Sequence, residues 1–161
     1  MAVSWTVRAR TTSAARTREL AASLAALARK GDVVILAGTL GAGKTTFAQG
    51  FARGLGVEGP VTSPTFTLLR QYPCALGQLL HADVYRLDHL VEVADLGLGE
   101  LVEDGIALVE WGDVAVPALG PVTWTVSITP VDEEEDEREV AVRAEGDDDR
   151  RGAVAAVLGS A

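Results

Sequence analysis

The sequence predicts a three-layer α/β fold, in which a mixed, mainly parallel central sheet lies between helices and carries an antiparallel hairpin toward the C-terminus. The run Val33–Ala37 is entirely apolar, as expected of a strand that is buried on both faces. A glycine-rich turn and an amphipathic helix follow it directly, in the order of a parallel α/β unit. Farther on, Trp124, Val126 and Ile128 alternate with polar residues, and the stretch beyond Asp132–Glu137 does the same, which predicts the hairpin.

The other elements follow in chain order from the same periodicities. Val3, Trp5 and Val7 alternate with polar residues and predict a short half-buried strand. Ser13 is a suitable N-cap and Gly31 a suitable stop for the helix between them. Further expected elements are helices at Ala14–Lys30, Thr45 to about Arg53, Leu90–Val102 and Arg151–Leu158, and strands at Leu79–Tyr85 and Ile106–Val109. Because no repeat or long linker divides the chain, we expect one domain over residues 1–161.

The composition limits the classes of function. The net charge is −9 at pH 7, and so acidic a surface repels phosphate backbones, which argues against unaided nucleic-acid binding. Cys74 is the single cysteine, so no internal disulfide can form, as suits a reducing cytoplasm. No apolar run approaches the roughly 20 residues of a membrane-spanning helix, and the N-terminal residues contain no apolar signal core. We therefore expect a soluble cytoplasmic protein.

The stretch from Gly38 to Thr45 carries the strongest chemical signal. It matches the phosphate-binding pattern G-x-x-x-x-G-K-[ST], known as Walker A, at every fixed position, between a buried strand and a helix. Glycines let successive backbone N–H groups turn toward one anion, and the helix N-terminus adds its dipole. We expect Lys44 on the β- and γ-phosphates, the Thr45 hydroxyl on Mg²⁺ and Thr46 near the α-phosphate. A flexible glycine turn with a solvated lysine is the alternative, and the flanking elements disfavour it.

Acidic residues that end two later strands are candidates for the rest of this site. Glu110 directly follows a buried strand, and parallel sheets gather their ligand sites at the carboxyl ends of strands, so Glu110 is the expected metal ligand. Asp83 shares a strand face with His81 and is a candidate for holding metal-bound water or orienting the attacking water. We interpret His81 as a hydrogen-bonded structural residue, because it has no metal-like spacing to His89. The Ser63–Phe66 segment lies where GTPases carry their first switch segment, and a hydroxyl there can sense the γ-phosphate.

In combination these segments resemble the TsaE family, formerly called YjeE. The order and spacing of the matching pieces agree from about Ser13 to Trp111, which is most of the chain. The pieces are Gly31-Asp32, Leu40–Phe47, Gly54–Val57, Val61, Ser63–Leu68, His81-x-Asp83-x-Tyr85-Arg86-Leu87 and Val109–Trp111. The ordered set is more specific than any of its parts outside the phosphate loop. Thr39 departs from the family pattern, which usually has Asp at that position.

The resemblance implies an Mg²⁺-dependent ATPase subunit required to form threonylcarbamoyladenosine next to the anticodon of tRNAs that read codons beginning with A. It implies action with the TsaB–TsaD pair, weak hydrolysis alone, and contact with tRNA only through that complex. The catalytic residues that it implies are Lys44, Asp83, Glu110 and Thr65. The implied nucleotide contacts are Ser13, Gly38, Leu40, Gly41, Ala42, Gly43, Lys44, Thr45, Thr46, Glu110 and Arg138, with Thr17 as a further candidate and with Thr45 and Glu110 as the metal ligands.

Two other classes stay open from the residues themselves. A small metabolite kinase would use the same phosphate loop, but it also needs an acceptor pocket and usually a lid with arginines. Beyond Trp111, the arginines that stand together are Arg150 and Arg151. A GTP-binding switch protein would commonly carry the base-reading motif N-K-x-D, which this sequence lacks. A phosphorylated small-molecule product would identify a kinase, and the ratio of ATP to GTP affinity would identify a GTPase.

Overall fold

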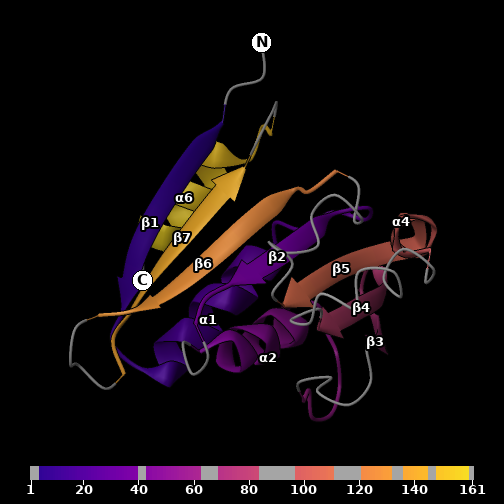
Figure 1. The fold of residues 1–161 in the computed structure, drawn as a ribbon, viewed down its shortest axis with the longest axis horizontal. Coiled ribbons are helices and arrows are strands. Elements are labelled where there is room, and N and C mark those ends of the chain that lie inside the picture. Colours follow the sequence, from indigo (N-terminus) through magenta and orange to yellow (C-terminus); the bar gives the residue numbers. More distant parts are fainter. Residues whose placement is uncertain are drawn as a thin grey trace.

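The computed structural model describes residues 4–39, 43–62, 69–83, 97–110, 121–131, 136–144 and 148–159. Within these ranges, seven strands form one sheet in the order β1-β7-β6-β2-β5-β4-β3 (Figure 1). The strands are β1 (Trp5–Thr11), β2 (Val33–Ala37), β3 (Leu69–Cys74), β4 (Gly77–Asp83), β5 (Gly105–Glu110), β6 (Trp124–Pro130) and β7 (Arg138–Ala144). The helices are α1 (Ala14–Ala25), α2 (Lys44–Gly54), α4 (Leu98–Leu101) and α6 (Arg151–Gly159), with a 3-10 turn η1 (Val102–Asp104).

β2 occupies the middle of the sheet, which explains why its sequence is wholly apolar. It pairs in parallel with β5 on one side and with β6 on the other. β4 continues the parallel set beyond β5, whereas β7 and β3 run antiparallel to their neighbours. The prediction of a mixed sheet with an antiparallel β6–β7 hairpin is confirmed, although only three of the six pairings between the described strands are parallel.

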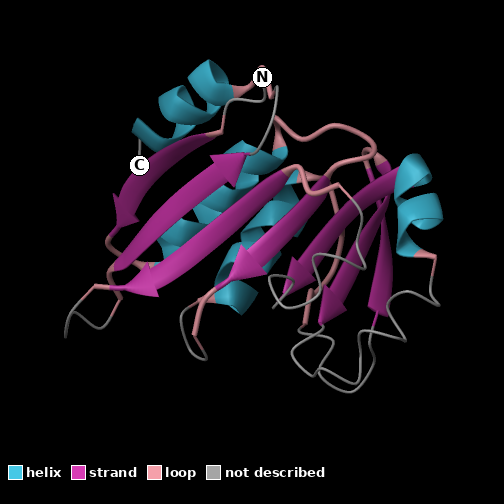
Figure 2. Cartoon of the chain, turned by 45° about the horizontal axis from the view of Figure 1, so that its top comes forward, coloured by secondary structure: helices cyan, strands magenta, loops and turns pink. Residues whose placement is uncertain are grey.

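Successive side chains of the central strands point into two different apolar layers. Val34 of β2 packs in one cluster with Leu24 of α1 and Phe51 of α2. Ile35, the next residue along β2, packs in a second cluster with Val102 of η1. α1, α2 and α6 all lie on one side of the sheet (Figure 2), and residues of all three belong to the first cluster. The sheet therefore has an apolar layer on each face, as the expected three-layer fold requires.

Two glycines let α2 approach α1 closely. Gly50 and Gly54 lie about one turn apart on α2, and both face the backbone of α1. A Cβ atom at Gly50 would overlap the backbone carbonyl of Arg18, and one at Gly54 would lie 2.5 Å from the carbonyl oxygen of Ala22. This close approach fixes the first turn of α2, and with it the end of the phosphate loop, relative to α1.

The first helix ends earlier than its periodicity predicts. The expected range was Ala14–Lys30, whereas α1 ends at Ala25. The N–H groups of Leu27 and Ala28 donate to carbonyls three residues back instead of four. The Asp32 carboxylate accepts a hydrogen bond from the backbone N–H of Arg29 at 2.7 Å. The predicted end was wrong because the apolar pattern does not determine this turn. The Asp32 side chain, which lies just before β2, determines it through its hydrogen bond to the backbone.

The boundaries of three strands differ from their expected positions, and β3 was not predicted. β5 spans Gly105–Glu110 and is one residue longer at each end than the predicted Ile106–Val109. β1 continues to Thr11, beyond the alternation that ends at Val7. β4 begins at Gly77, two residues before the predicted start. β3 escaped prediction because its sequence contains Pro73 and no regular alternation. Proline is tolerated there because β3 is the outermost strand of the sheet.

The segment before β5 contains less described helix than the sequence predicts. Of the expected helix at Leu90–Val102, the structure describes α4 as helix, and Val102 begins the η1 turn. Residues 90–96 lie outside the described residues. No helix in the described part of the chain is long and apolar enough to cross a membrane.

Candidate functional site

The carboxyl ends of β2, β5 and β4 meet at one edge of the sheet, because these neighbouring strands are parallel. The register places Leu36 of β2 opposite Glu110, and Glu110 opposite Asp83. Leu36 belongs to the cluster that packs against α1 and α2, so the row that it forms with Glu110 and Asp83 lies on the face covered by those helices. The two predicted acids are thus adjacent, on the same face as α2.

The phosphate loop leaves this edge of the sheet and enters α2 through a glycine. Gly43 is the N-cap of α2 and has φ 106°, a left-handed conformation that favours glycine. A Cβ atom at Gly43 would lie 3.7 Å from Nε of Arg138, so the start of β7 approaches the loop closely. The expected phosphate contacts Leu40, Gly41 and Ala42 lie outside the described residues.

Lys44 begins α2 and is 6% exposed. Its Nζ donates a hydrogen bond to the carbonyl oxygen of Gly38 at 2.8 Å, so the side chain reaches back across the loop to its first residue. Thr45 is exposed and Thr46 is half-buried. A lysine ammonium at a helix N-terminus is typical of a phosphate-binding loop.

Glu110 and His81 form a buried pair beneath the same edge. Nε2 of His81 lies 2.7 Å from Oε2 of Glu110, and the two side chains are 0% and 4% exposed. The interpretation of His81 as a hydrogen-bonded residue is therefore confirmed, with Glu110 as its partner. Its other ring nitrogen, Nδ1, is buried and has no hydrogen-bond partner among the described residues.

The oxygen donors at this edge suit an Mg²⁺ ion that is shared with phosphates and water. They do not suit a metal ion that is held by protein side chains alone. The described residues contain no group of three or more His, Cys, Asp or Glu side chains placed to hold a metal ion. Mg²⁺ commonly binds through one or two protein oxygens together with substrate phosphates and water. A threonine hydroxyl on α2 and a carboxylate at the end of β5 supply oxygen donors of that kind, so the residues present fit such an ion.

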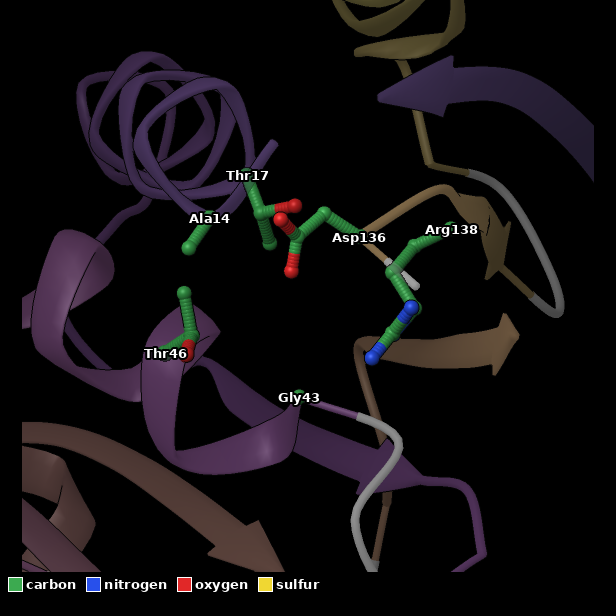
Figure 3. A pocket seen from close by; sticks show the side chains of 6 residues that line it. All are labelled: Ala14, Thr17, Gly43, Thr46, Asp136 and Arg138. Carbon is green, nitrogen blue, oxygen red and sulfur yellow. The ribbon is translucent and has the colours of Figure 1, made fainter. Parts of the chain in front are cut away.

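A small cavity opens between α1, the start of α2 and the β7 end of the hairpin (Figure 3). Its volume is about 40 Å³, which is far below that of a complete ligand pocket. The guanidinium of Arg138 points toward Gly43, while the carboxylate of Asp136 points toward Thr17 (Figure 3). The lining residues are Ala14, Thr17, Gly43, Thr46, Asp136 and Arg138. The cavity thus brings three expected nucleotide contacts, Gly43, Thr46 and Arg138, to one place with the further candidate Thr17.

Ser13 has its predicted place as the N-cap of α1, and its role as a nucleotide contact stays a prediction. The hydroxyl of Ser13, an expected nucleotide contact, accepts a hydrogen bond from the backbone N–H of Arg16 at 3.1 Å and caps α1. Ser13 does not line the cavity. Asp136 does line it, although an acidic stretch between the two strands of a hairpin is expected to lie in solvent. Its position two residues before Arg138, an expected nucleotide contact, is the signal that could have placed Asp136 near the site.

Thr65, with the rest of Ser63–Phe66, lies outside the described residues, and its predicted role stays a prediction. The family-motif residues Tyr85, Arg86 and Trp111 also lie outside the described residues.

Arg150 lies at the opposite edge of the sheet and forms buried hydrogen bonds with two carboxylates there. Its guanidinium donates to Asp32 at 2.7 Å and to Asp148 at 2.8 Å, and it stacks 4.6 Å from the ring centroid of Trp124. Burial by itself would lower the pKa of the guanidinium, but the hydrogen bonds to both carboxylates outweigh burial and raise that pKa above its usual value. Asp32 immediately precedes β2, so this network is at the amino end of the strand whose carboxyl end leads to the phosphate loop. Arg150 therefore cannot serve as a lid arginine of the kind that a kinase uses.

Comparisons with known proteins agree on one family. The family model described as "Threonylcarbamoyl adenosine biosynthesis protein TsaE" matches residues 11–140. The tRNA threonylcarbamoyladenosine biosynthesis protein TsaE of Bacillus subtilis (strain 168) is 42% identical over 138 residues, which cover 85% of each chain. The protein of the same name from Streptomyces coelicolor is 50% identical over 106 residues, covering 63% of this chain and 71% of the relative.

A solved structure extends the similarity to the whole fold. The crystal structure of YdiB from Bacillus subtilis superposes with a TM-score of 0.78 and 34% sequence identity. The superposition covers 98% of this chain and 97% of that one. The match of the family model to most of the chain and the identity to the Bacillus subtilis protein over 85% of each chain lead to one conclusion: the chain belongs to the TsaE family of threonylcarbamoyl adenosine biosynthesis proteins.

Proposed function

We propose that this protein binds ATP with Mg²⁺ at the carboxyl edge of β2, β5 and β4 and hydrolyses it, in the cytoplasm, as a subunit of the machinery that forms threonylcarbamoyladenosine in tRNA. The observation that carries the proposal is the buried Lys44 ammonium, which lies at the N-terminus of α2 against the carbonyl of Gly38. Backbone N–H groups and the helix dipole favour an anion at the N-terminus of a helix, so the position of this ammonium there supports phosphate as the ligand. Family membership supports the pathway.

Each residue of the edge has a distinct part in this proposal. The backbone N–H groups at the start of α2 bind phosphate oxygens, and Lys44 neutralises the charge on the β- and γ-phosphates. The Thr45 hydroxyl and the Glu110 carboxylate hold the magnesium ion. Asp83, adjacent to Glu110 in the register, orients the attacking water. Arg138, whose Nε lies near Gly43, contributes positive charge from the side of the hairpin.

When bound, Mg²⁺ supplies Lewis-acid stabilisation of the negative charge that develops on the phosphate oxygens. The contribution of the chain is to present a fixed lysine, a fixed carboxylate and oriented N–H groups, so that little rearrangement is required when the nucleotide binds.

The proposed partners are the TsaB–TsaD pair, with tRNA contacted only through that assembly. The net charge of −9 supports this arrangement, because a surface of that sign does not attract a polyanion. Hydrolysis by the chain alone is expected to be weak and to rise when the partners are present.

Reconstitution with purified partners tests the proposal. We expect the chain to copurify with TsaB and TsaD in a nucleotide-dependent manner, and to restore threonylcarbamoyladenosine to the tRNA of cells that lack their own TsaE. Lys44→Ala should fail in both assays. Lys30→Ala is the matched control, because Lys30 is the other lysine of the chain and is exposed. Normal levels of the modified adenosine in cells without a functional copy would contradict the proposal.

A further inference from the structure

The pair formed by His81 and Glu110 lies within the proposed site but has no part in the chemistry assigned so far. We propose that His81 is a positioning residue, which fixes the orientation of the Glu110 carboxylate for magnesium binding. This inference rests on the proposed function of Glu110 and adds a further residue to it.

The contact is short and fully enclosed. Nε2 of His81 and Oε2 of Glu110 are 2.7 Å apart, which is the range of charge-assisted hydrogen bonds. An ionised carboxylate only accepts hydrogen bonds, so the ring nitrogen that faces it donates the proton. Because the two side chains are 0% and 4% exposed, water does not compete for the bond.

The bond from His81 engages one of the two carboxylate oxygens. Within the described residues, His81 is the hydrogen-bond partner of Glu110 at Oε2, and no bond to Oε1 is found. A carboxylate that ligates a metal is commonly held by a hydrogen bond to its second oxygen, which sets its direction and its basicity. The arrangement therefore assigns Oε2 to His81 and Oε1 to the cation or to a water of the cation.

The sheet register explains why an orienting donor is useful at this position. Asp83 is directly opposite Glu110 on the neighbouring strand, whereas His81 is opposite Leu108. His81, Asp83 and Glu110 share one face, so two carboxylates of like charge stand side by side. Repulsion between them would drive the longer Glu110 side chain into other rotamers. The hydrogen bond from His81 holds it toward the interior of β4 instead.

The second ring nitrogen argues against a purely structural role. Nδ1 is buried with no hydrogen-bond partner among the described residues, and an unsatisfied buried polar atom costs about 1–3 kcal/mol. A leucine at this position would avoid that cost among the surrounding apolar residues. A histidine at this position, despite its unsatisfied Nδ1, is explained if its Nε2 bond positions the Glu110 carboxylate.

The test measures how strongly magnesium and nucleotide binding are coupled, without any turnover. For each variant, isothermal titration gives the Kd of a non-hydrolysable ATP analogue in EDTA and in excess MgCl₂. We call the Kd in EDTA divided by the Kd in MgCl₂ the magnesium coupling. We expect His81→Leu and Glu110→Gln each to lower this ratio by about 10-fold or more, as loss of a residue that supports a metal ligand commonly does. The Kd in EDTA should change little.

Three further variants separate positioning from folding. His81→Gln keeps an amide donor that reaches the same carboxylate, so it should retain the wild-type ratio. Gln78→Leu is the control, because Gln78 lies on the same strand at its other end, opposite Gly105. The double variant His81→Leu/Glu110→Gln should behave as Glu110→Gln alone, since both changes remove one interaction.

The outcomes separate the positioning role of His81 from the proposed role of Glu110 as a magnesium ligand, on which it rests. A folded His81→Leu protein with wild-type coupling, beside a Glu110→Gln protein that has lost it, overturns the role of His81 and leaves the proposed function intact. Wild-type coupling in Glu110→Gln overturns both. If the leucine variant does not fold, His81→Gln decides the question alone, because loss of coupling in a folded glutamine variant contradicts the inference and retention supports it.

Discussion

Replacing Arg150 by methionine removes the cation from the buried network at the amino edge of the sheet and keeps a side chain of similar length. The guanidinium makes hydrogen bonds to Asp32 at 2.7 and 3.2 Å and to Asp148 at 2.8 and 3.2 Å. It also donates to the carbonyl oxygen of Leu27 at 3.2 Å. These contacts join α6 to the end of α1 and to the start of β2, so their loss affects three elements at once.

The expected magnitude follows from what the substitution leaves behind. The side chains of Asp32 and Asp148 are 10% and 8% exposed, so both carboxylates would stay buried without their cation. Breaking a buried ion pair in this way costs about 3–5 kcal/mol. For a chain of this size, each kcal/mol corresponds to a change in Tm of about 2–4 °C. Arg150→Met should therefore lower Tm by about 6–20 °C.

Thermal and urea denaturation, followed by circular dichroism, measure this effect. Arg151→Met is the matched control, because Arg151 is the next residue in the chain and is exposed. Its free energy of unfolding should change by no more than about 0.5 kcal/mol. The effect of Arg150→Met should also depend little on salt, since buried pairs are screened weakly. Equal losses in the two variants would refute the assignment of Arg150 as a buried structural cation.

Three further substitutions test other parts of the account. Gly43→Ala forces a side chain into a left-handed conformation at a cost of about 1–2 kcal/mol, so nucleotide affinity measured by titration should fall about 10-fold; an unchanged Kd would contradict the loop geometry. Gly50→Ala places a Cβ atom on the backbone of Arg18 and should destabilise the protein by about 1–3 kcal/mol in urea, whereas Gly152→Ala, where nothing lies within 4 Å, should be neutral or stabilising. Burial would raise the pKa of Asp148, but hydrogen bonds from Arg150 outweigh it and lower that pKa, so this contribution to stability is present above about pH 4 and is lost as the pH falls further. Asp148→Asn should lack that part of the acid dependence, and an identical pH profile would argue against the pairing.

The sequence predicts the centre of the molecule well, because the strongest patterns are there. A strand buried on both faces has no polar residues, so β2 could be placed with its observed bounds, Val33–Ala37. The glycine-lysine pattern then located the start of α2 within one residue. These features depend on local chemistry, and no distant residue is needed to specify them.

Features that depend on distant contacts could not be predicted. β3 is a strand because its backbone pairs with β4, and its own sequence, with Pro73, does not favour one. α1 ends early because Asp32, which lies beyond the predicted helix boundary, organises the turn. The bond between His81 and Glu110 joins residues 29 positions apart, so sequence could suggest a bonded histidine without naming its partner.

The site shows the same division. Lys44 and Glu110 could be identified as candidates because a motif and a strand end mark them. The place of Asp136 in the cavity beside Thr17 could not, because it depends on how the hairpin packs over α1. An acidic run in a hairpin is also what solvent exposure alone would produce.

The affinity for Mg²⁺–ATP in the wild-type protein and in Lys44→Ala decides whether the phosphate loop binds the nucleotide. Lys44 is buried and its ammonium lies on the carbonyl of Gly38, so a charge-assisted bond to phosphate worth about 1.5–3 kcal/mol should disappear with it. Isothermal titration should show a Kd at least about 10-fold higher in Lys44→Ala, with Lys30→Ala unchanged. Equal affinity in Lys44→Ala and the wild-type protein, or an equal loss in both lysine variants, would contradict the account.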